Sequence, residues 1–177
     1  MMNDSYVLLE VGSQPYFTTF QDLDGRLAFS INDVEQKPNL LVRLMREPQW
    51  SQQHPEIMGP NTSFMYFGPE KSSGYLIYGN GPNQPMNSSV RQKKGVANTR
   101  YFTAQNGKEL KWKIADGRME CYNGRTLIAI YEPVMSAEKR ATARLTIKQP
   151  GLPICTEIVT ALLLNRMAMA FGWPDSS

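Results

Sequence analysis

The sequence predicts a mainly β protein in which a closed antiparallel barrel of about twelve strands surrounds one buried C-terminal hydrophobic helix. Two observations predict this fold. Short runs of alternating apolar and polar residues, separated by turn signals, fill the chain as far as residue 148. Residues 151–173 are then apolar on every side of a helical wheel. A helix of this kind needs a shell of protein, and a sheet of about a dozen strands must curl or close.

The N-terminal half is predicted to form consecutive antiparallel strands. Residues 6–11 and 16–20 are β-prone runs, and residues 22–25 form a turn that leads into the next strand. Two later runs alternate, with their apolar side chains on one face: Leu27, Phe29 and Ile31 in the first, and Leu40, Val42 and Leu44 in the second.

The middle of the chain is less regular. Residues 47–62 contain three prolines and predict a surface loop or a helical turn. Residues 63–68 and 74–79 are predicted strands that carry aromatic side chains on both faces, so one of these faces is a candidate surface for a ligand or a partner. Residues 79–98 are rich in glycine and proline and then basic, which predicts a long loop.

The C-terminal half predicts five more strands. They cover residues 99–104, 108–115, 118–122, 126–132 and 142–147. Asn-Gly or Asp-Gly stands between the first four, and these dipeptides are strong hairpin signals. In the second of these strands, Leu110, Trp112 and Ile114 face one way while Lys111 and Lys113 face the other.

The C-terminal helix is predicted at about residues 153–171. Pro153 suits a first helical turn, and Gly172 followed by Pro174 provides a stop. Glu157, Asn165 and Arg166 interrupt the apolar surface, which favours a buried core helix over a membrane span. We therefore expect a barrel with the helix running through it. A sandwich with the helix capping one open end is the alternative.

Length and composition are those of a single globular domain over residues 1–177, with 41% hydrophobic and 20% charged residues. The first residues have no basic or long apolar segment typical of a signal peptide, so we expect an intracellular protein, cytoplasmic or at the membrane periphery. Cys121 and Cys155 are then expected to be reduced and buried.

The charge is unevenly distributed along the chain. Residues 1–80 carry five Lys/Arg against nine Asp/Glu, a balance of −4, whereas residues 81–177 carry fourteen against seven, a balance of +7. A basic loop beside strand lysines can hold an anionic headgroup, although a solubilising surface is the alternative. The candidate anion-binding residues are Arg91, Lys93, Lys94, Arg100, Lys111 and Lys113.

No catalytic, metal or cofactor motif stands out. His54 is the only histidine, it lies in a polar loop, and we expect it to be a solvated side chain. One histidine and two distant cysteines do not form a zinc site, and no glycine-rich phosphate loop is present. Asp22 and Asp24 provide too few ligands for calcium and indicate a turn. The sequence predicts a protein that is not an enzyme and needs no cofactor.

Several segments of the second half resemble an uncharacterised fungal family related to the tubby C-terminal-like superfamily. They are residues 101–114 (YFTAQNGKELKWKI), 119–133 (MECYNGRTLIAIYEP) and 143–151 (ARLTIKQPG), together with an apolar helix that contains Ile158-Val159-Thr160. The resemblance implies a twelve-stranded barrel around a central helix, as in tubby, phospholipid scramblase and LURP-one-related proteins. Tubby proteins bind phosphoinositides through basic residues on the barrel, but this chain has no matching motif, and no site residue is carried over.

The expected function is a non-enzymatic binding module for an anionic phospholipid, a phosphoinositide or another phosphorylated partner. The alternative is a protein-interaction or structural protein without a small ligand. A hydrolase ranks third. We expect no nucleic acid partner, and we do not expect an integral membrane protein.

Overall fold

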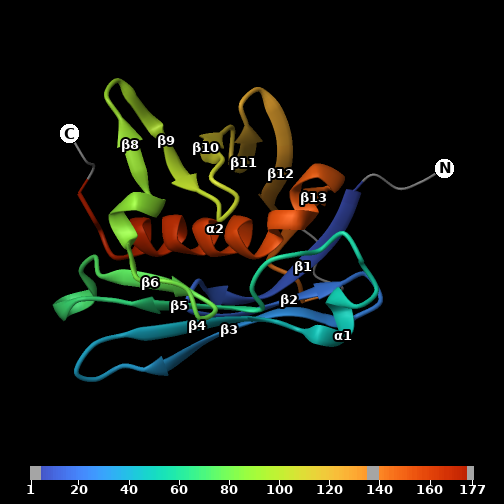
Figure 1. The fold of residues 1–177 in the computed structure, drawn as a ribbon, viewed down its shortest axis with the longest axis horizontal. Helices are drawn as coiled ribbons and strands as arrows, with labels where there is room; N and C mark the ends of the chain where they lie inside the picture. The colour runs from blue at the N-terminus through green and yellow to red at the C-terminus, as the bar shows by residue number, and fades with distance from the viewer. Residues whose placement is uncertain (1–4, 135–139, 175–177) are drawn as a thin grey trace.

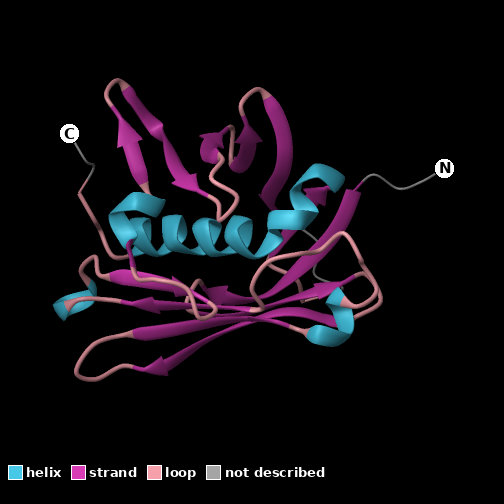
Figure 2. Cartoon of the chain, in the orientation of Figure 1, coloured by secondary structure: helices cyan, strands magenta, loops and turns pink. Residues whose placement is uncertain are grey.

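One antiparallel sheet of thirteen strands dominates the computed structural model, which describes residues 5–134 and 140–174 (Figures 1 and 2). The strands of the N-terminal half are β1 (Ser5–Gln14), β2 (Phe17–Asp22), β3 (Leu27–Glu35), β4 (Leu41–Arg46), β5 (Thr62–Tyr66), β6 (Tyr75–Tyr78) and β7 (Gln84–Pro85). Those of the C-terminal half are β8 (Arg91–Lys93), β9 (Val96–Thr103), β10 (Glu109–Ala115), β11 (Arg118–Asn123), β12 (Thr126–Pro133) and β13 (Ala143–Lys148). The prediction of a mainly β protein is confirmed.

A single long-range pairing joins the two halves of the sheet. Strands β1 and β13 run antiparallel, with Tyr6 opposite Ile147 and Glu10 opposite Ala143. The sheet order is then β7 to β1 followed by β13 to β8. Helix α2 (Cys155–Ala170) lies between these two halves, with β1–β6 on one side and the hairpins of β8–β12 on the other (Figure 1).

The predicted closed barrel is wrong, because the sheet keeps two edges, β7 and β8. These strands contain only two and three residues, and Pro85 in β7 has no N–H to donate to a neighbouring strand. The chain instead crosses from one edge to the other through the 3₁₀ turn η2 (Met86–Ser89), which packs against β7, β9 and α2. The predicted alternative, a sandwich with the helix over one end, is not observed either.

Alternation of side chains across the strands agrees with the predicted faces in most places. Leu40, Val42 and Leu44 are buried, and in β10 Leu110 and Trp112 point into the core. There are two exceptions. Leu27 is 36% exposed because an irregularity in the pairing of β2 with β3 changes the face that it occupies. Ile114, near the end of β10, is 43% exposed.

The turn predictions of the C-terminal half are confirmed, and the five strands predicted there are β9 to β13. Gly107, Gly117 and Gly124 have φ of +85°, +78° and +63°, a left-handed backbone that glycine adopts at little cost. The predicted loop at residues 79–98 is wrong, since this segment contains β7, η2, β8 and the start of β9.

Helix α2 is enclosed by the sheet, as predicted, and thirteen of its sixteen residues are buried. Pro153 belongs to a 3₁₀ turn, η4 (Gln149–Ile154), and the α-helix begins only at Cys155. Among the described residues, one helical segment, Gln149–Ala170, is long and apolar enough to cross a membrane, but 83% of its apolar window is buried within the protein. This burial is consistent with a protein that is not integral to a membrane.

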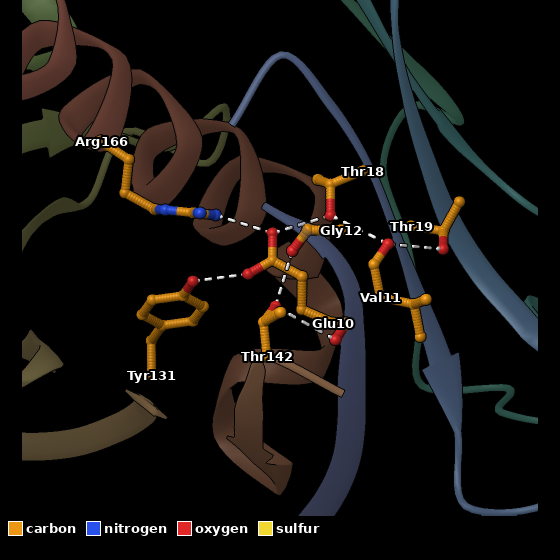
Figure 3. Close-up of polar contacts among 8 residues, drawn as sticks. All are labelled: Glu10, Val11, Gly12, Thr18, Thr19, Tyr131, Thr142 and Arg166. Atoms are coloured by element: carbon orange, nitrogen blue, oxygen red, sulfur yellow. Dashed lines mark hydrogen bonds and ion pairs between the residues drawn. The ribbon is translucent and has the colours of Figure 1, made fainter. Parts of the chain in front are cut away.

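A buried ion pair fastens the C-terminal part of α2 to the sheet (Figure 3). Arg166 Nη1 donates to Glu10 Oε2 at 2.8 Å, and the guanidinium lies 4.9 Å from the centre of the Tyr131 ring. Thr18 Oγ1 and the Tyr131 hydroxyl also donate to the Glu10 carboxylate, at 2.9 and 2.5 Å. Glu10 is fully buried, and these three donors from β2, β12 and α2 compensate its loss of water.

A second buried polar cluster surrounds the start of α2. Arg46, at the end of β4, donates to the Thr156 hydroxyl at 3.0 Å, to Pro60 O at 3.2 Å and to the side chain of Asn61 at 2.7 Å. The guanidinium thereby holds the irregular segment that follows the short helix α1 (Pro48–Ser51) against the helix. Ser63 and Thr160 join β5 to α2 through a hydrogen bond of 2.8 Å.

Candidate anion-binding cleft

A cleft of about 740 Å³, which we call the seam cleft, lies beside β8, one of the two edges of the sheet. Its volume lies in the range of small-molecule sites in proteins. One wall comes from the basic edge of the sheet: Arg91, Gln92, Lys93, Arg100 and Glu109. The remaining lining residues come from the segment between β5 and β6, from η2 and its end, and from the chain beyond α2: Ser72, Ser73, Asn87, Val90, Trp173 and Pro174.

Strand register places Arg91 of the basic wall on the outer face of the sheet. Arg91 lies opposite Tyr101, and Tyr101 lies opposite Lys111, so these three side chains share the outer face of the sheet. The ammonium group of Lys93 lies 4.0 Å from the centre of the Tyr101 ring, within the range of a cation–π contact. The ring thus helps to hold Lys93 at the cleft.

Glu109 is the acidic member of this wall. Lys93 Nζ donates to its Oε1 at 2.9 Å, and Arg91 Nη2 donates to its Oε2 at 3.2 Å. The hydrogen bond from Lys93 and the two nearby positive charges lower the pKa of the Glu109 carboxyl below its ordinary value. The carboxylate is therefore ionised at neutral pH.

Arg100 enters the cleft from the inner face of β9. It lies opposite Trp112, a core residue whose indole N–H donates to Ile158 O at 3.1 Å. Arg100 also lines a smaller cavity of about 130 Å³, next to Asn165 and Met169 of α2. It therefore connects the cleft with the C-terminal half of the helix.

The opposite wall is fixed by contacts of Trp173. Its indole N–H donates to Lys71 O at 2.7 Å, and its ring centre lies 5.9 Å from that of Phe67. Ser73 Oγ donates to Asn87 Oδ1 at 3.0 Å. The cleft thus offers an aromatic ring and small polar groups across from its cations.

Three of the six predicted anion-binding residues, Arg91, Lys93 and Arg100, line the seam cleft. The other three lie outside it. Lys94 is exposed in the turn between β8 and β9. Lys111 and Lys113 lie on the outer face of β10, with Lys111 beside the Tyr122 ring and Lys113 opposite Glu120. The site therefore divides into a cleft and a basic outer surface.

Sequence reasoning missed Glu109 and Trp173. A sequence signal for Glu109 was present, because Glu109 alternates with Lys111 and Lys113 and should therefore lie on the same outer face of the strand. Trp173 had none, since its position depends on contacts with Phe67 and Lys71, about a hundred residues away.

The remaining candidates have structural roles. His54 is half-buried, with its ring 4.8 Å from that of Tyr6 and 5.1 Å from that of Trp50, so the prediction of a solvated side chain is wrong. Asp22 accepts backbone N–H groups of Asp24 and Arg26, which confirms the turn. In the described parts of the chain, no three His, Cys, Asp or Glu side chains cluster closely enough to hold a metal ion.

Both cysteines are free and buried, as predicted. Burial raises the pKa of the Cys155 thiol to about 11, and burial also raises the pKa of Cys121. Neither thiol is exposed as a reactive cysteine is, although Arg46 lies near Cys155 and partly opposes the effect of burial on its pKa.

The fold and the cleft define a protein in which an open antiparallel sheet encloses a helix and leaves a basic cleft at its seam. The chain belongs to a family of unknown function, DUF6593, which matches residues 13–168. A solved X-ray structure of a protein from Arabidopsis thaliana is similar, with 10% identity and a TM-score of 0.43, covering 92% of this chain and 90% of that chain. No curated protein matches the sequence at a significant level.

Proposed function

We propose that the protein is a non-enzymatic binding module whose seam cleft holds the phosphate of an anionic phospholipid, a phosphoinositide or another phosphorylated partner. The observation that carries this proposal is that Arg91, Lys93 and Arg100 all line one cleft of about 740 Å³. Arginine and lysine are the side chains that most often bind phosphate groups in proteins.

The resemblance to the tubby C-terminal-like superfamily adds support of a general kind. A helix enclosed by antiparallel strands is common to the expected and the observed architecture, although the sheet here is open. We extend the proposal to an intracellular protein, cytoplasmic or at the periphery of a membrane, where anionic headgroups are available.

A protein-interaction function is the second candidate, and the outer face of β5 and β6 favours it. The rings of Tyr66 and Tyr75 are stacked with their centres 4.7 Å apart, and Phe64 lies beside them with its centre 6.4 Å from that of Tyr66. Tyr75 is 39% exposed. Accessible aromatic side chains of this kind are enriched at protein interfaces.

The two candidates are separated by titrating phosphoinositide-containing vesicles into wild type and two matched variants. Arg91→Ser/Lys93→Ser removes two positive charges from the cleft. Lys94→Ser/Lys108→Ser removes two from exposed turns of the same region, outside the cleft. Each basic residue near an acidic surface contributes about 1 kcal/mol, so we expect the first variant to bind roughly 30-fold more weakly and the second to bind almost as wild type.

Salt provides a second criterion, because binding through these charges weakens as ionic strength rises. Equal losses in both variants would indicate general charge attraction and would contradict the cleft as the site. Absence of binding by wild type, even at low salt, would contradict the phospholipid function and favour the protein-interaction candidate.

A further inference from the structure

Two cations of the seam cleft are already occupied by a carboxylate of the chain itself. Lys93 and Arg91 each contact a different oxygen of Glu109, so the two cations are spaced to hold two oxygens of one anionic group. All three side chains are accessible to solvent, with exposed fractions of 54%, 41% and 43% for Lys93, Arg91 and Glu109. The ion pairs can therefore exchange with an anion from solution.

We propose that Glu109 is a built-in counter-ion, which an incoming phosphate monoester must displace, and that it makes the cleft selective for a dianionic group. This inference rests on the proposed function and adds the class of ligand and the way in which binding is controlled. The shared chemistry is a terminal phosphate monoester, whether it belongs to a lipid headgroup or to a soluble ester.

The charge balance explains the selectivity. A monoanion that displaces Glu109 replaces one negative charge beside Arg91 and Lys93 with another. The exchange therefore contributes little electrostatic free energy to binding. A phosphate monoester carries nearly two negative charges at neutral pH and three acceptor oxygens, so it neutralises both cations at once. Glu109 lies in the first position of β10, and its exposed carboxylate can turn into water when it is displaced.

Other contacts keep the two cations in place when Glu109 leaves. Arg91 Nη2 also donates to the Thr103 hydroxyl at 2.9 Å, and Lys93 retains its contact with the Tyr101 ring. The Nε–H of Arg91 is buried and has no hydrogen-bond partner among the described residues, so an anion is expected to bind through the terminal nitrogens of the guanidinium. The site is thus preorganised for an anion with more acceptor oxygens than a carboxylate provides.

The test compares Glu109→Gln with wild type, and it uses Glu132→Gln as a matched control. Glu132 forms an ion pair with Arg144 at 2.9 Å and does not line the seam cleft, so the control changes the net charge equally. Calorimetry at pH 7.5 measures binding of phenyl phosphate, a dianion, and of phenyl sulfate, a monoanion. Vesicles that contain phosphatidic acid, a monoester, or phosphatidylglycerol, a diester, form the lipid arm.

We expect Glu109→Gln to bind phenyl phosphate about tenfold more tightly than wild type, since two exposed ion pairs no longer compete. We expect Glu132→Gln to match wild type, and wild type to prefer phenyl phosphate over phenyl sulfate. If Glu109→Gln binds phenyl phosphate more tightly than wild type does, a soluble ester is supported as the ligand. If Glu109→Gln binds more tightly only to phosphatidic acid vesicles, a lipid headgroup is supported.

Three results would contradict parts of this account in different ways. If wild type binds and Glu109→Gln binds no more tightly, Glu109 is not a competitor, while the proposed function stands. If wild type binds the sulfate and the diester as well as the monoesters, the selectivity is wrong. If no protein binds any probe, both the proposed function and this inference are wrong.

Discussion

Glu157 is an acidic residue enclosed at the first turn of α2, with only 2% of its surface exposed. Its Oε2 accepts the N–H of Gln105 at 3.3 Å, and among the described residues its Oε1 has no hydrogen-bond partner. Burial raises the pKa of the Glu157 carboxyl, and the hydrogen bond from Gln105 and the nearby Arg46 oppose this effect. The residue is therefore a source of instability at neutral pH.

The sign of its pH dependence follows from the raised pKa. Between the ordinary carboxyl pKa of about 4.3 and the higher pKa of Glu157, the folded state binds more protons than the unfolded state. The free energy of unfolding therefore falls as pH rises through this window. In Glu157→Gln the amide keeps an acceptor for Gln105 without the charge, so we expect about 1–2 kcal/mol more stability at pH 8 and a flatter profile between pH 5 and 8.

Urea denaturation of wild type and Glu157→Gln at pH 5 and pH 8 checks this prediction, since contributions of all other groups cancel in the difference. Glu132→Gln, at a surface ion pair, controls for the loss of one acidic group. A Glu157→Gln protein with the same pH dependence as wild type would show that Glu157 is not strained by burial.

The sequence could predict which residues face the core but not which distant polar groups meet there. Alternation identified Leu40, Val42 and Leu44 because neighbouring residues on one strand determine that pattern. The sequence also showed that Glu157 and Arg166 interrupt the helix. The partner of Arg166 is Glu10, 156 residues away, and such a pair depends on the pairing of β1 with β13, which no local pattern reveals.

At the scale of elements, α2 is the centre of the core. Leu162, Leu163 and Leu164 are consecutive and fully buried, which requires protein on every side of the helix. Strands alone could not provide this shell if they formed a single flat sheet. The pairing of β1 with β13 brings the two halves of the sheet to opposite sides of the helix (Figure 1).

Leu163→Asp should therefore destabilise the protein severely, by several kcal/mol, because an unpaired carboxylate would be buried among apolar side chains. Ala170→Asp is the matched control, since Ala170 is exposed in the last turn of the same helix. Thermal unfolding followed by circular dichroism measures both. Equal melting temperatures for Leu163→Asp and wild type would show that the helix is not central to the fold.

Sequence patterns missed the two short edge strands, β7 and β8, between which the sheet stays open. The glycine-rich and proline-rich segment 79–98 predicted a loop, and much of it is short edge strand and 3₁₀ turn. Two-residue and three-residue strands lack enough alternation to be recognised. The closed barrel was predicted because a sheet with about a dozen strands must curl or close. In the structure, the η2 turn, which carries the fully buried Met86, instead lies between the two edge strands β7 and β8.

At the scale of the whole molecule, the uneven charge of the sequence becomes a difference between two sides. Residues 1–80, with a charge balance of −4, contain β1–β6, whereas residues 81–177, with a balance of +7, contain β8–β12, and these two groups of strands lie on opposite sides of α2 (Figure 1). The seam cleft lies where the two sides meet, with its cations on the basic side. An approaching anion is thus attracted to one side of the protein and reaches the cleft at its border.

The central claim is that a phosphate group binds between Arg91 and Lys93 in the seam cleft. The most direct measurement is a titration of ¹⁵N-labelled protein with phenyl phosphate, followed by ¹H–¹⁵N NMR spectra. We predict that the backbone amides of Arg91 and Lys93 and the indole N–H of Trp173 shift together with one dissociation constant, because all three residues line the cleft. Shifts confined to Lys94, Lys111 and Lys113, with the cleft signals unchanged, would contradict the claim.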